Sequence, residues 1–337
     1  MTDEPILGDA DLVPPVHAGH ARAWYCDGGG AREVAPEEAV RLAVAGAAPV
    51  WIDLDGLDAA RAIDLLGPLQ IHPVAIEDMV AEINRPKVDD YGDYLYLAVH
   101  SARWEETERP KLREIDLLVG ARFLVTFHEG ATRSIDHAVE LLPKRPDLLA
   151  RGPAHLLHFL LDVMVDGWLP ITDHLSERVD ALEEDVVRGR GRRMSVEILK
   201  LKRGMSALRR IVGPQRDTVL ALTRDEFRAI PADVRPYLRD VYDRLARMTD
   251  LLDSYRDEIA GLLDLHMTQV SNRLNQVMKA LTVVSTIVLP LTLITGYYGM
   301  NVKIAAFEWK HGEWFVFGVL LATGLGTWWL MRRRDWT

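Results

Sequence analysis

The chain has 337 residues, a formal net charge of −10 and 27% charged residues. That charged fraction is too high for a bundle made only of membrane helices, so most of the chain is expected to be a water-soluble part that buries its own core. The single cysteine, Cys26, excludes a disulfide framework and a thiolate metal site.

The first 20 residues are an acidic start without regular structure. They lack a basic region followed by an apolar one, so they do not resemble a signal peptide. Together with the lone cysteine, this predicts that the large N-terminal part faces the cytosol.

Between residues 23 and 129, the sequence predicts an α/β domain with a mixed sheet. The expected strands are rich in Val, Ile, Leu and Tyr and are separated by Gly or Asp. They are Ala23–Cys26, Pro49–Leu54, Tyr94–Arg103, Glu114–Val119 and Arg122–Phe127. Helices are expected at Pro36–Ala45 and Asp58–Leu66, and the first opens with a proline and two glutamates, a favourable first turn.

Strand patterns then disappear and long amphipathic helices are expected. They cover Ala154–Arg188 and Ser195–Val212, and a helix-rich connection reaches Pro236. The last helix is expected over Tyr237–Tyr298, on the order of 90 Å at ~1.5 Å per residue. A helix of that length needs partners from its own chain or from copies of itself.

Two uncharged, mostly apolar runs lie near the C-terminus, Ala280–Asn301 and Trp314–Met331. Each is about as long as a helix that crosses a bilayer of ~30 Å. Arg332–Arg334 follow the second run and favour a cytoplasmic C-terminus, so two spans also return the N-terminal part to the cytoplasm. A peripheral protein with a buried helical hairpin is the alternative, and the tryptophans near both ends of the second run favour a membrane span.

A stripe of alternating small polar and apolar side chains follows the last helix into the first run, at steps of three and four residues. The stripe consists of Asn275, Met278, Thr282, Ser285, Leu289, Thr292 and Gly296. Hydroxyls and amides suit the lining of an aqueous pore, and apolar rings suit a gate that closes by dewetting. Helix–helix packing also favours small and hydroxylated residues and is the alternative.

Two spans cannot enclose an aqueous path, so a pore requires a ring of identical chains. No Asp or Glu lies between Asp264 and Glu308, so the first span offers no carboxylate to a dehydrated divalent ion. Mg²⁺ gives up its waters reluctantly, and a neutral polar lining suits an ion that keeps them. Asn301 at the outer end provides an amide oxygen for metal-bound water, and Gly299 leaves room for a tight turn beside it.

The segment Tyr298-Gly299-Met300-Asn301 between two C-terminal spans resembles the Gly-Met-Asn signature of the CorA family of divalent-cation transporters, the magnesium channels and related zinc transporters. The resemblance includes the segments Asn275–Thr282, Leu289–Thr292, His72–Asp78 and Arg85–Val88. It covers most of the chain from about residue 23 to the end.

This resemblance implies a homopentameric funnel in which an α/β cytosolic domain and a long helical stalk precede two C-terminal transmembrane helices. Asn301 would form the outer selectivity ring, and Asn275 a polar ring at the cytosolic mouth. Met278, Leu281 and Leu289 would form the hydrophobic constriction. Further pore positions would be Thr292 and Gly296.

Regulatory metal positions are also implied by the resemblance. Asp264 would meet Asp78 across a subunit boundary, and a second cluster would comprise Glu77, Asp162 and Asp240. Facing carboxylates repel unless a cation bridges them, so bound Mg²⁺ would hold the cytosolic domains closed and its loss would let the pore open. A solvated helix face is the alternative for Asp78 and Asp264.

The expected segments are a cytosolic α/β domain at 1–150, a helical domain and stalk at 151–279, spans at 280–301 and 314–331, an outer loop at 302–313 and a basic tail at 332–337. The protein is expected to be multi-pass in the inner or plasma membrane, with both termini cytoplasmic. Its expected partners are copies of itself, the bilayer and divalent cations, and nucleic acid is not among them. Mg²⁺ is the expected transported and regulatory ion, with Zn²⁺ and Co²⁺ as alternatives.

One residue departs from the magnesium channels, which commonly carry an acidic, proline-containing motif in the outer loop. Lys303 lies two residues after Asn301, where it would repel cations. Zinc transport is therefore the runner-up, although Met300 favours the magnesium branch. Uptake or efflux, and passive flow or proton coupling, stay open.

Rival functions have weaker support. His128-Glu129 is not followed by a second His at helical spacing, no Walker-type loop is present, and Gly28–Gly30 is a bare turn, so the chain is expected not to be an enzyme. A membrane-tethered sensor or scaffold is the remaining alternative, and metal flux into liposomes distinguishes it from a transporter. The histidines are scattered and none lies within the first span, so that span offers no zinc-type ligand set.

Overall fold

The computed structural model describes residues 19–28, 30–81, 84–104, 110–189, 194–300 and 310–334. Residue contacts divide the chain into two units, unit 1 up to Leu262 and unit 2 from Leu263 onward. Helix α9 (Arg235–Tyr298) contributes to both units. The six segments expected from the sequence stay a prediction.

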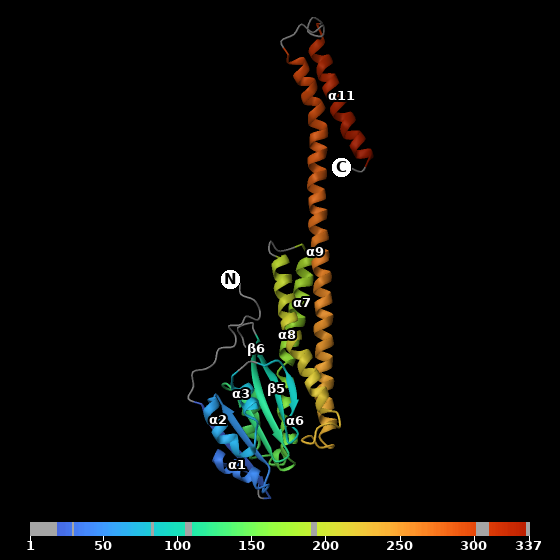
Figure 1. The fold of residues 1–337 in the computed structure, drawn as a ribbon. Helices are drawn as coiled ribbons and strands as arrows, with labels where there is room; N and C mark the ends of the chain where they lie inside the picture. Colours follow the sequence, from blue (N-terminus) through green and yellow to red (C-terminus); the bar gives the residue numbers. More distant parts are fainter. Residues whose placement is uncertain are drawn as a thin grey trace. The chain divides into compact units, whose positions relative to one another are not determined.

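Unit 1 contains a seven-stranded sheet with the strand order β2-β1-β3-β7-β6-β5-β4 (Figure 1). Its central pair, β3 and β7, is parallel, and all other neighbouring pairs are antiparallel. The strands are β1 (His20–Asp27), β2 (Gly30–Val34), β3 (Val50–Asp55), β4 (Lys87–Asp90), β5 (Tyr94–Trp104), β6 (Pro110–Gly120) and β7 (Phe123–His128). The expectation of a mixed sheet is confirmed.

The sequence did not predict β2 and β4, which form the two edges of the sheet. Both are short and carry charged side chains, with the sequences GAREV and KVDD. Natural edge strands are often short and charged, which discourages pairing with other chains and also removes the alternating apolar pattern. Of the glycines expected as a bare turn, Gly28 follows β1 and Gly30 begins β2, while Gly29 lies outside the described residues.

Helices cover both faces of the sheet (Figure 1). On one face, α1 (Pro36–Val44), α2 (Ala59–Leu66), the 3-10 helix η2 (Gly67–Leu69) and α3 (Pro73–Ala81) pack on a core that includes alternate residues of β3. The opposite face is covered by α4 (Arg133–Leu141), α5 (Asp147–Ala150) and α6 (Pro153–Asp166). Ten of the side chains of α6 are buried, so this helix lies inside unit 1.

Three long helices complete the chain of unit 1, α7 (Leu169–Val187), α8 (Met194–Leu222) and the first part of α9. The single helix expected over Ala154–Arg188 is two helices, because Pro170 occupies the first turn of α7, where its missing N–H costs no hydrogen bond. Gly167 at this break is tightly packed, since an added Cβ would lie 2.5 Å from the carbonyl oxygen of Ala102.

A buried polar network crosses the centre of the sheet, on the face opposite α1. Asp53 is 1% exposed, and its carboxylate accepts hydrogen bonds from Arg22 Nη2 at 2.8 Å and Thr126 Oγ1 at 2.7 Å. It also lies 3.1 Å from His128 Nε2. Burial favours neutral forms, but these contacts outweigh it, so the pKa of Asp53 is lowered and the pKa of His128 is raised. The network therefore holds a carboxylate charge inside unit 1.

We expect Asp53→Asn to lower the free energy of unfolding by about 3–5 kcal/mol, because Arg22 and His128 would lose their buried counter-charge. Denaturant unfolding of the detergent-solubilised chain, followed by circular dichroism at 222 nm, measures this loss. Asp64→Asn, at an exposed position of α2, is the matched control and should change stability by less than about 0.5 kcal/mol. Equal effects of the two variants would contradict a structural role for the network.

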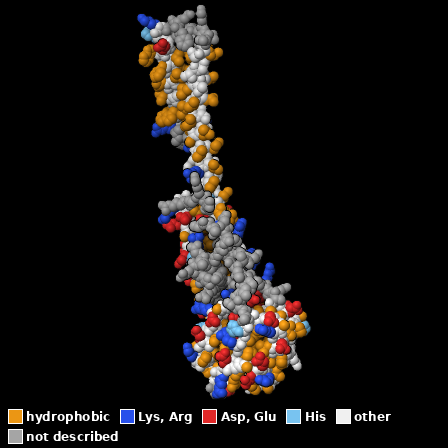
Figure 2. Space-filling view, turned by 90° about the vertical axis from the view of Figure 1, so that its left-hand side faces the viewer, with side chains coloured by type: hydrophobic (Ala, Val, Ile, Leu, Met, Phe, Trp, Pro, Cys, Tyr) orange, Lys and Arg blue, Asp and Glu red, His pale blue; other side chains and the backbone are white. Residues whose placement is uncertain are grey.

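Unit 2 consists of the C-terminal part of α9 and α11 (Gly312–Arg333). Among the described residues, three helical stretches are long and apolar enough to cross a membrane: Pro153–Val187, Arg235–Tyr298 and Gly312–Arg333. In the first, 67% of the apolar window is buried, as expected of a core helix, whereas 0% of the other two windows is buried. Hydrophobic side chains cover much of the visible surface of unit 2, and charged side chains are spread over that of unit 1 (Figure 2).

Candidate functional site

The expected pore stripe lies on the unburied part of α9. Its described members from Asn275 to Gly296 are all within this helix, as is Tyr298, while Gly299 and Met300 follow its end. Its apolar members are strongly exposed, with 59% for Met278 and 72% for Leu289, and Leu281, expected in the hydrophobic constriction, is 57% exposed. Asn301 lies outside the described residues, so its place at the end of the stripe stays a prediction.

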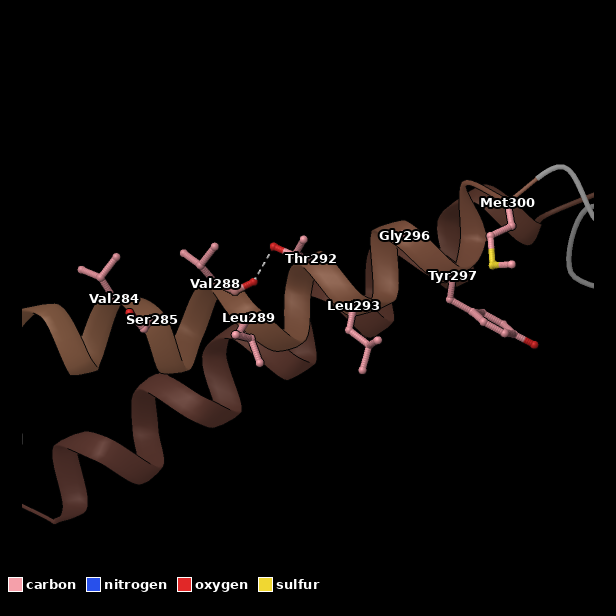
Figure 3. A pocket seen from close by; sticks show the side chains of 9 residues that line it. All are labelled: Val284, Ser285, Val288, Leu289, Thr292, Leu293, Gly296, Tyr297 and Met300. Atoms are coloured by element: carbon pink, nitrogen blue, oxygen red, sulfur yellow. Dashed lines mark hydrogen bonds between the residues drawn. The ribbon is translucent and has the colours of Figure 1, made fainter.

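A groove of about 760 Å³ runs along this face of α9 (Figure 3). Four of its lining residues were expected from the stripe, namely Ser285, Leu289, Thr292 and Gly296. Met300 at its end was also expected, as part of the signature. The other four, Val284, Val288, Leu293 and Tyr297, were not predicted from the sequence. These residues recur at four- and five-residue steps, which the single stripe at steps of three and four did not include.

Hydroxyl groups on this part of α9 bond to their own helix. Thr282 Oγ1 donates to the carbonyl oxygen of Met278 at 2.8 Å, and Thr292 Oγ1 donates to that of Val288 at 2.9 Å (Figure 3 shows the second bond). Such back-bonding satisfies the donor within the helix and leaves the oxygen lone pairs free to accept. The threonines can therefore offer acceptors to water without carrying charge.

The helix continues through Pro290, which has no N–H for the carbonyl oxygen of Thr286. Membrane helices tolerate such a proline where another donor or water satisfies the freed carbonyl. Gly299 donates its N–H to the carbonyl oxygen of Thr295 at 2.8 Å, and an added Cβ would lie 3.0 Å from that same oxygen. The glycine thus allows the tight end of α9 just before the signature is completed.

Helix α11 lies beside the end of α9 (Figure 1), and Gly324 faces Leu291, since a Cβ added to the glycine would lie 3.8 Å from the leucine methyls. Its C-terminal end pairs basic and aromatic side chains. Arg332 lies 5.3 Å above the ring of Trp328, and Arg333 lies 5.2 Å above that of Trp329. Cation–π pairs of this kind suit the polar boundary of a bilayer.

The first carboxylate expected to be regulatory, Asp78, is on α3 and is paired within the chain. Its Oδ2 atom lies 3.0 Å from Lys87 Nζ, and the same ammonium lies 3.3 Å from Asp89 Oδ2. Its expected partner, Asp264, is an exposed residue of α9 in unit 2. The carboxylate that would receive a regulatory cation is therefore already beside a basic side chain.

The second expected cluster is brought together in part. Asp162 on α6 and Asp240 on α9 both lie against Arg244: Nη2 donates to Asp162, and Nε is 3.6 Å from Asp240 Oδ2. Asp166, which the sequence analysis missed, accepts from Arg244 Nη1 at 2.6 Å. Glu77 is an exposed residue of α3 and is not among the carboxylates that Arg244 holds.

Within the described residues of a single chain, no group of three or more His, Cys, Asp and Glu side chains is arranged to hold a metal ion. Asp78, Asp162 and Asp240 each lie instead against a basic side chain of the same chain.

The family model for "CorA-like Mg²⁺ transporter protein" matches residues 46–333. The chain belongs to this family. It is 30% identical to the cobalt/magnesium transport protein CorA of Thermotoga maritima, over 81% of this chain and 79% of the relative. It is 26% identical to the zinc transport protein ZntB of Cronobacter sakazakii, over 93% of this chain and 94% of the relative.

The fold of this CorA-like chain is also similar to that of the complete CorA magnesium transporter from Methanocaldococcus jannaschii. The TM-score is 0.78 at 20% identity, with 94% of this chain and 98% of the other covered. The expectation of an α/β domain followed by a long helix is confirmed by this likeness. Family membership makes the chain a membrane-bound divalent-cation transporter and excludes the enzymatic alternative.

The CorA-like chain also contains an acidic pair, a partly buried Glu114 and a buried Asp116, that was not predicted from the sequence. Glu114 and Asp116 are two residues apart on β6 and share the face that packs towards α3. Asn84 donates its backbone N–H to both oxygens of Glu114 at 2.9 Å, and Tyr96 Oη donates to Asp116 Oδ1 at 2.7 Å. Acidic residues within an otherwise apolar strand, Glu114-Ile-Asp116, were the available signal.

Burial shifts the protonation of this pair. It raises the pKa of Glu114 to about 7, and burial together with the nearby Glu114 charge raises the pKa of Asp116 well above its usual range. A partly buried and a buried carboxyl group so close together cannot both ionise at low cost, so the pair retains a proton near neutral pH.

We expect the free energy of unfolding to fall as pH rises from about 5 to about 8, by up to about 1.4 kcal/mol per pH unit for one proton. The reason is that the carboxyl group has a higher pKa in the folded chain than in the unfolded chain. Its contribution to stability is fully present at pH values below the pKa of the unfolded state, and it is lost as the pH rises through the pKa of the folded state. Denaturant unfolding at several pH values measures the slope. Glu114→Gln should flatten it, and Glu140→Gln, at an exposed position of α4, should leave it unchanged.

Proposed function

We propose that this chain conducts hydrated Mg²⁺ through a pore formed by five copies, each contributing α9, and that cytosolic Mg²⁺ bound between subunits closes the pore. The observation that carries the proposal is the uncharged stripe on α9, whose acceptors and apolar side chains remain uncovered within one chain and lead to the Gly-Met-Asn signature. The similarity to the cobalt/magnesium transport protein CorA of Thermotoga maritima supports the choice of divalent cations.

The chemistry of the stripe favours a hydrated ion. Residues between Asp264 and Glu308 include no carboxylate, so nothing in the span replaces the inner waters of Mg²⁺. Threonine oxygens at Thr282 and Thr292 accept hydrogen bonds from metal-bound water, and Met278 and Leu289 supply rings that dewet when the pore narrows. Asn301 then selects hydrated ions at the outer end.

Orientation follows from the charge flanking the spans. Arg332 and Arg333 form the end of α11 and Arg334 follows it, and the positive-inside rule favours a cytoplasmic position for them. With α9 and α11 as the two spans, unit 1 lies in the cytoplasm as well. The protein would be a multi-pass protein of the inner or plasma membrane, with residues 302–313 outside.

Regulation uses carboxylates from neighbouring chains. A cation that bridges Asp78 of one subunit and Asp264 of the next would relieve their repulsion and hold unit 1 in a closed arrangement. The second cluster, Glu77, Asp162 and Asp240, is a weaker candidate, because a cation there must compete with Arg244 for two of its three carboxylates. The bridge at Asp78 is therefore the principal regulatory site of the proposal.

Asn301→Ala should lower Mg²⁺ flux into liposomes by at least about tenfold, because the ring that accepts hydrogen bonds from the hydrated ion would be lost. A magnesium-sensitive dye inside the liposomes measures the flux, and size-exclusion chromatography checks that assembly is intact. Thr327→Ala on α11, whose hydroxyl bonds within its own helix, is the control and should conduct normally. Normal flux in the Asn301 variant would remove the selectivity ring from the proposal.

Zinc transport, with or without proton coupling, is the second candidate, because the zinc transport protein ZntB matches nearly the whole chain and Lys303 departs from the magnesium pattern. Flux of Mg²⁺ and Zn²⁺ compared with and without a pH gradient separates the two. Passive conduction of a hydrated ion predicts Mg²⁺ flux that does not depend on the gradient. Zn²⁺ flux that requires the gradient, with little Mg²⁺ flux, would favour the second candidate.

A further inference from the structure

Lys87 forms an ion pair with Asp78, the carboxylate to which the proposed function assigns the regulatory cation. The following inference rests on that proposed function. The ammonium group lies 3.0 Å from Asp78 Oδ2 and 3.3 Å from Asp89 Oδ2. The three side chains are partly open to solvent, with 32% exposure for Lys87, 36% for Asp78 and 46% for Asp89. A dissolved cation and Lys87 therefore have access to the same oxygen.

The backbone determines where Lys87 can reach. Lys87 and Asp89 are two residues apart on β4 and project from the same face of the strand, which is paired with β5 through Asp89 opposite Tyr96. The Lys87 ammonium lies 4.9 Å from the centre of the Tyr96 ring. The lysine stem is thus directed towards α3, where Asp78 is located, and its charged end has two acceptors within reach.

Further negative charge lies behind this pair. Asn84 links the groups, because its Nδ2 donates to the Asp78 carbonyl at 3.0 Å and to Tyr96 Oη at 3.2 Å, while its backbone N–H donates to Glu114. The positive charge of Lys87 also favours the ionised forms of the buried pair Glu114 and Asp116. Lys87 is the counter-ion nearest to Asp78 among the described contacts, within a setting that is otherwise acidic.

The contrast with Arg244 indicates which of the two basic side chains can be displaced. Arg244 is 20% exposed, and its planar fork holds Asp162, Asp166 and Asp240 from two helices at once. A guanidinium in such a geometry is a fixed structural element. Lys87 is a flexible point charge, and Asp89 offers it a second acceptor when Asp78 is taken by another cation.

We propose that Lys87 is an intramolecular competitor for the divalent cation at Asp78, and that it sets the cation concentration at which the regulatory site fills. Binding of the cation transfers the ammonium from Asp78 to Asp89, so Lys87 keeps a carboxylate partner. Lys87 thereby raises the threshold without contributing a ligand. An exposed ion pair of this kind is weak enough to be displaced at ordinary cation concentrations.

The test uses the full-length chain in detergent and measures the Mg²⁺ concentration that gives half-maximal protection against limited proteolysis. Lys87→Met should lower this concentration about fivefold, the effect of about 1 kcal/mol. Lys87→Arg, which retains the charge, should not lower it. Lys144→Met, at an exposed position after α4, is the matched control and should equal the original chain. An unchanged half-maximal concentration in Lys87→Met would overturn the proposal.

A second variant covers the case in which Lys87→Met does not fold. Asp89→Asn removes the alternative acceptor, so Lys87 should stay on Asp78 and the half-maximal Mg²⁺ concentration should rise about twofold or more. Asp90→Asn, the next acidic residue of β4, corrects for the general loss of one negative charge. Equal shifts in these two variants would also overturn the competitor role.

Asp78→Asn separates this inference from the proposed function. Loss of Mg²⁺ protection in Asp78→Asn, together with no shift in Lys87→Met, would reject the competitor and retain the regulatory site. Full protection in Asp78→Asn would reject both the site at Asp78 and the competitor, while Mg²⁺ flux into liposomes would still report separately on the pore.

Discussion

Burial along α9 ends at Leu262, although the helix continues to Tyr298. Up to that residue, Leu238, Val241, Leu245 and their successors pack inside unit 1, and beyond it no residue of the helix is buried. Apolar side chains such as Leu289 and Leu293 are then more than 70% exposed, which water would not allow at low cost. A bilayer on one side and copies of the same helix on the other would satisfy this constraint, and in the proposed pore the uncharged polar groups between the copies would line the path of a hydrated ion.

The acidic character of the chain has a second consequence, because several carboxylates of unit 1 lie near a basic side chain of the same chain. Asp53 in the sheet contacts Arg22 and His128. Arg244 contacts carboxylates of α6 and α9. The Lys87 ammonium lies within ion-pair distance of both Asp78 and Asp89. These contacts differ in burial, and burial decides their role. A buried pair costs several kcal/mol to break, so it stabilises one arrangement, whereas a partly exposed lysine exchanges partners easily.

The strongest patterns in the sequence were those set by periodicity and by uncharged length. The central strands, the last long helix and the two apolar runs were all predictable, because burial or lipid imposes one side-chain character over many residues. The edge strands β2 and β4 were not, because charged edge strands lack that pattern. The split into α6 and α7 depends on Gly167 and Pro170, which the apolar spacing of the two helices conceals.

Some residues of the candidate site were predictable in the same way, and others were not. Stripe residues such as Ser285 and Thr292 follow from helical spacing, since one helix fixes their common face. The pairing of Asp78 with Lys87, and the burial of Glu114 and Asp116, depend on how β4, β6 and α3 come together, and contacts of this kind are not encoded in local spacing.

Competition by the Lys87 ammonium gives the proposed regulatory site an adjustable cation threshold, which two bridging carboxylates alone would lack. A ligand shifts a conformational equilibrium only by the difference between its affinities for the two states. Suppose that Asp264 of a neighbour reaches Asp78 only in the closed arrangement. The cation then binds most tightly in the closed state, and there it replaces Lys87 at Asp78. Because Lys87 can pair with Asp89 instead, breaking its ion pair with Asp78 costs little free energy. Most of the cation's affinity difference between the two states is therefore retained. The same local acidity that attracts Mg²⁺ thus also retains the competitor, so the threshold depends on β4 as much as on the two bridging carboxylates.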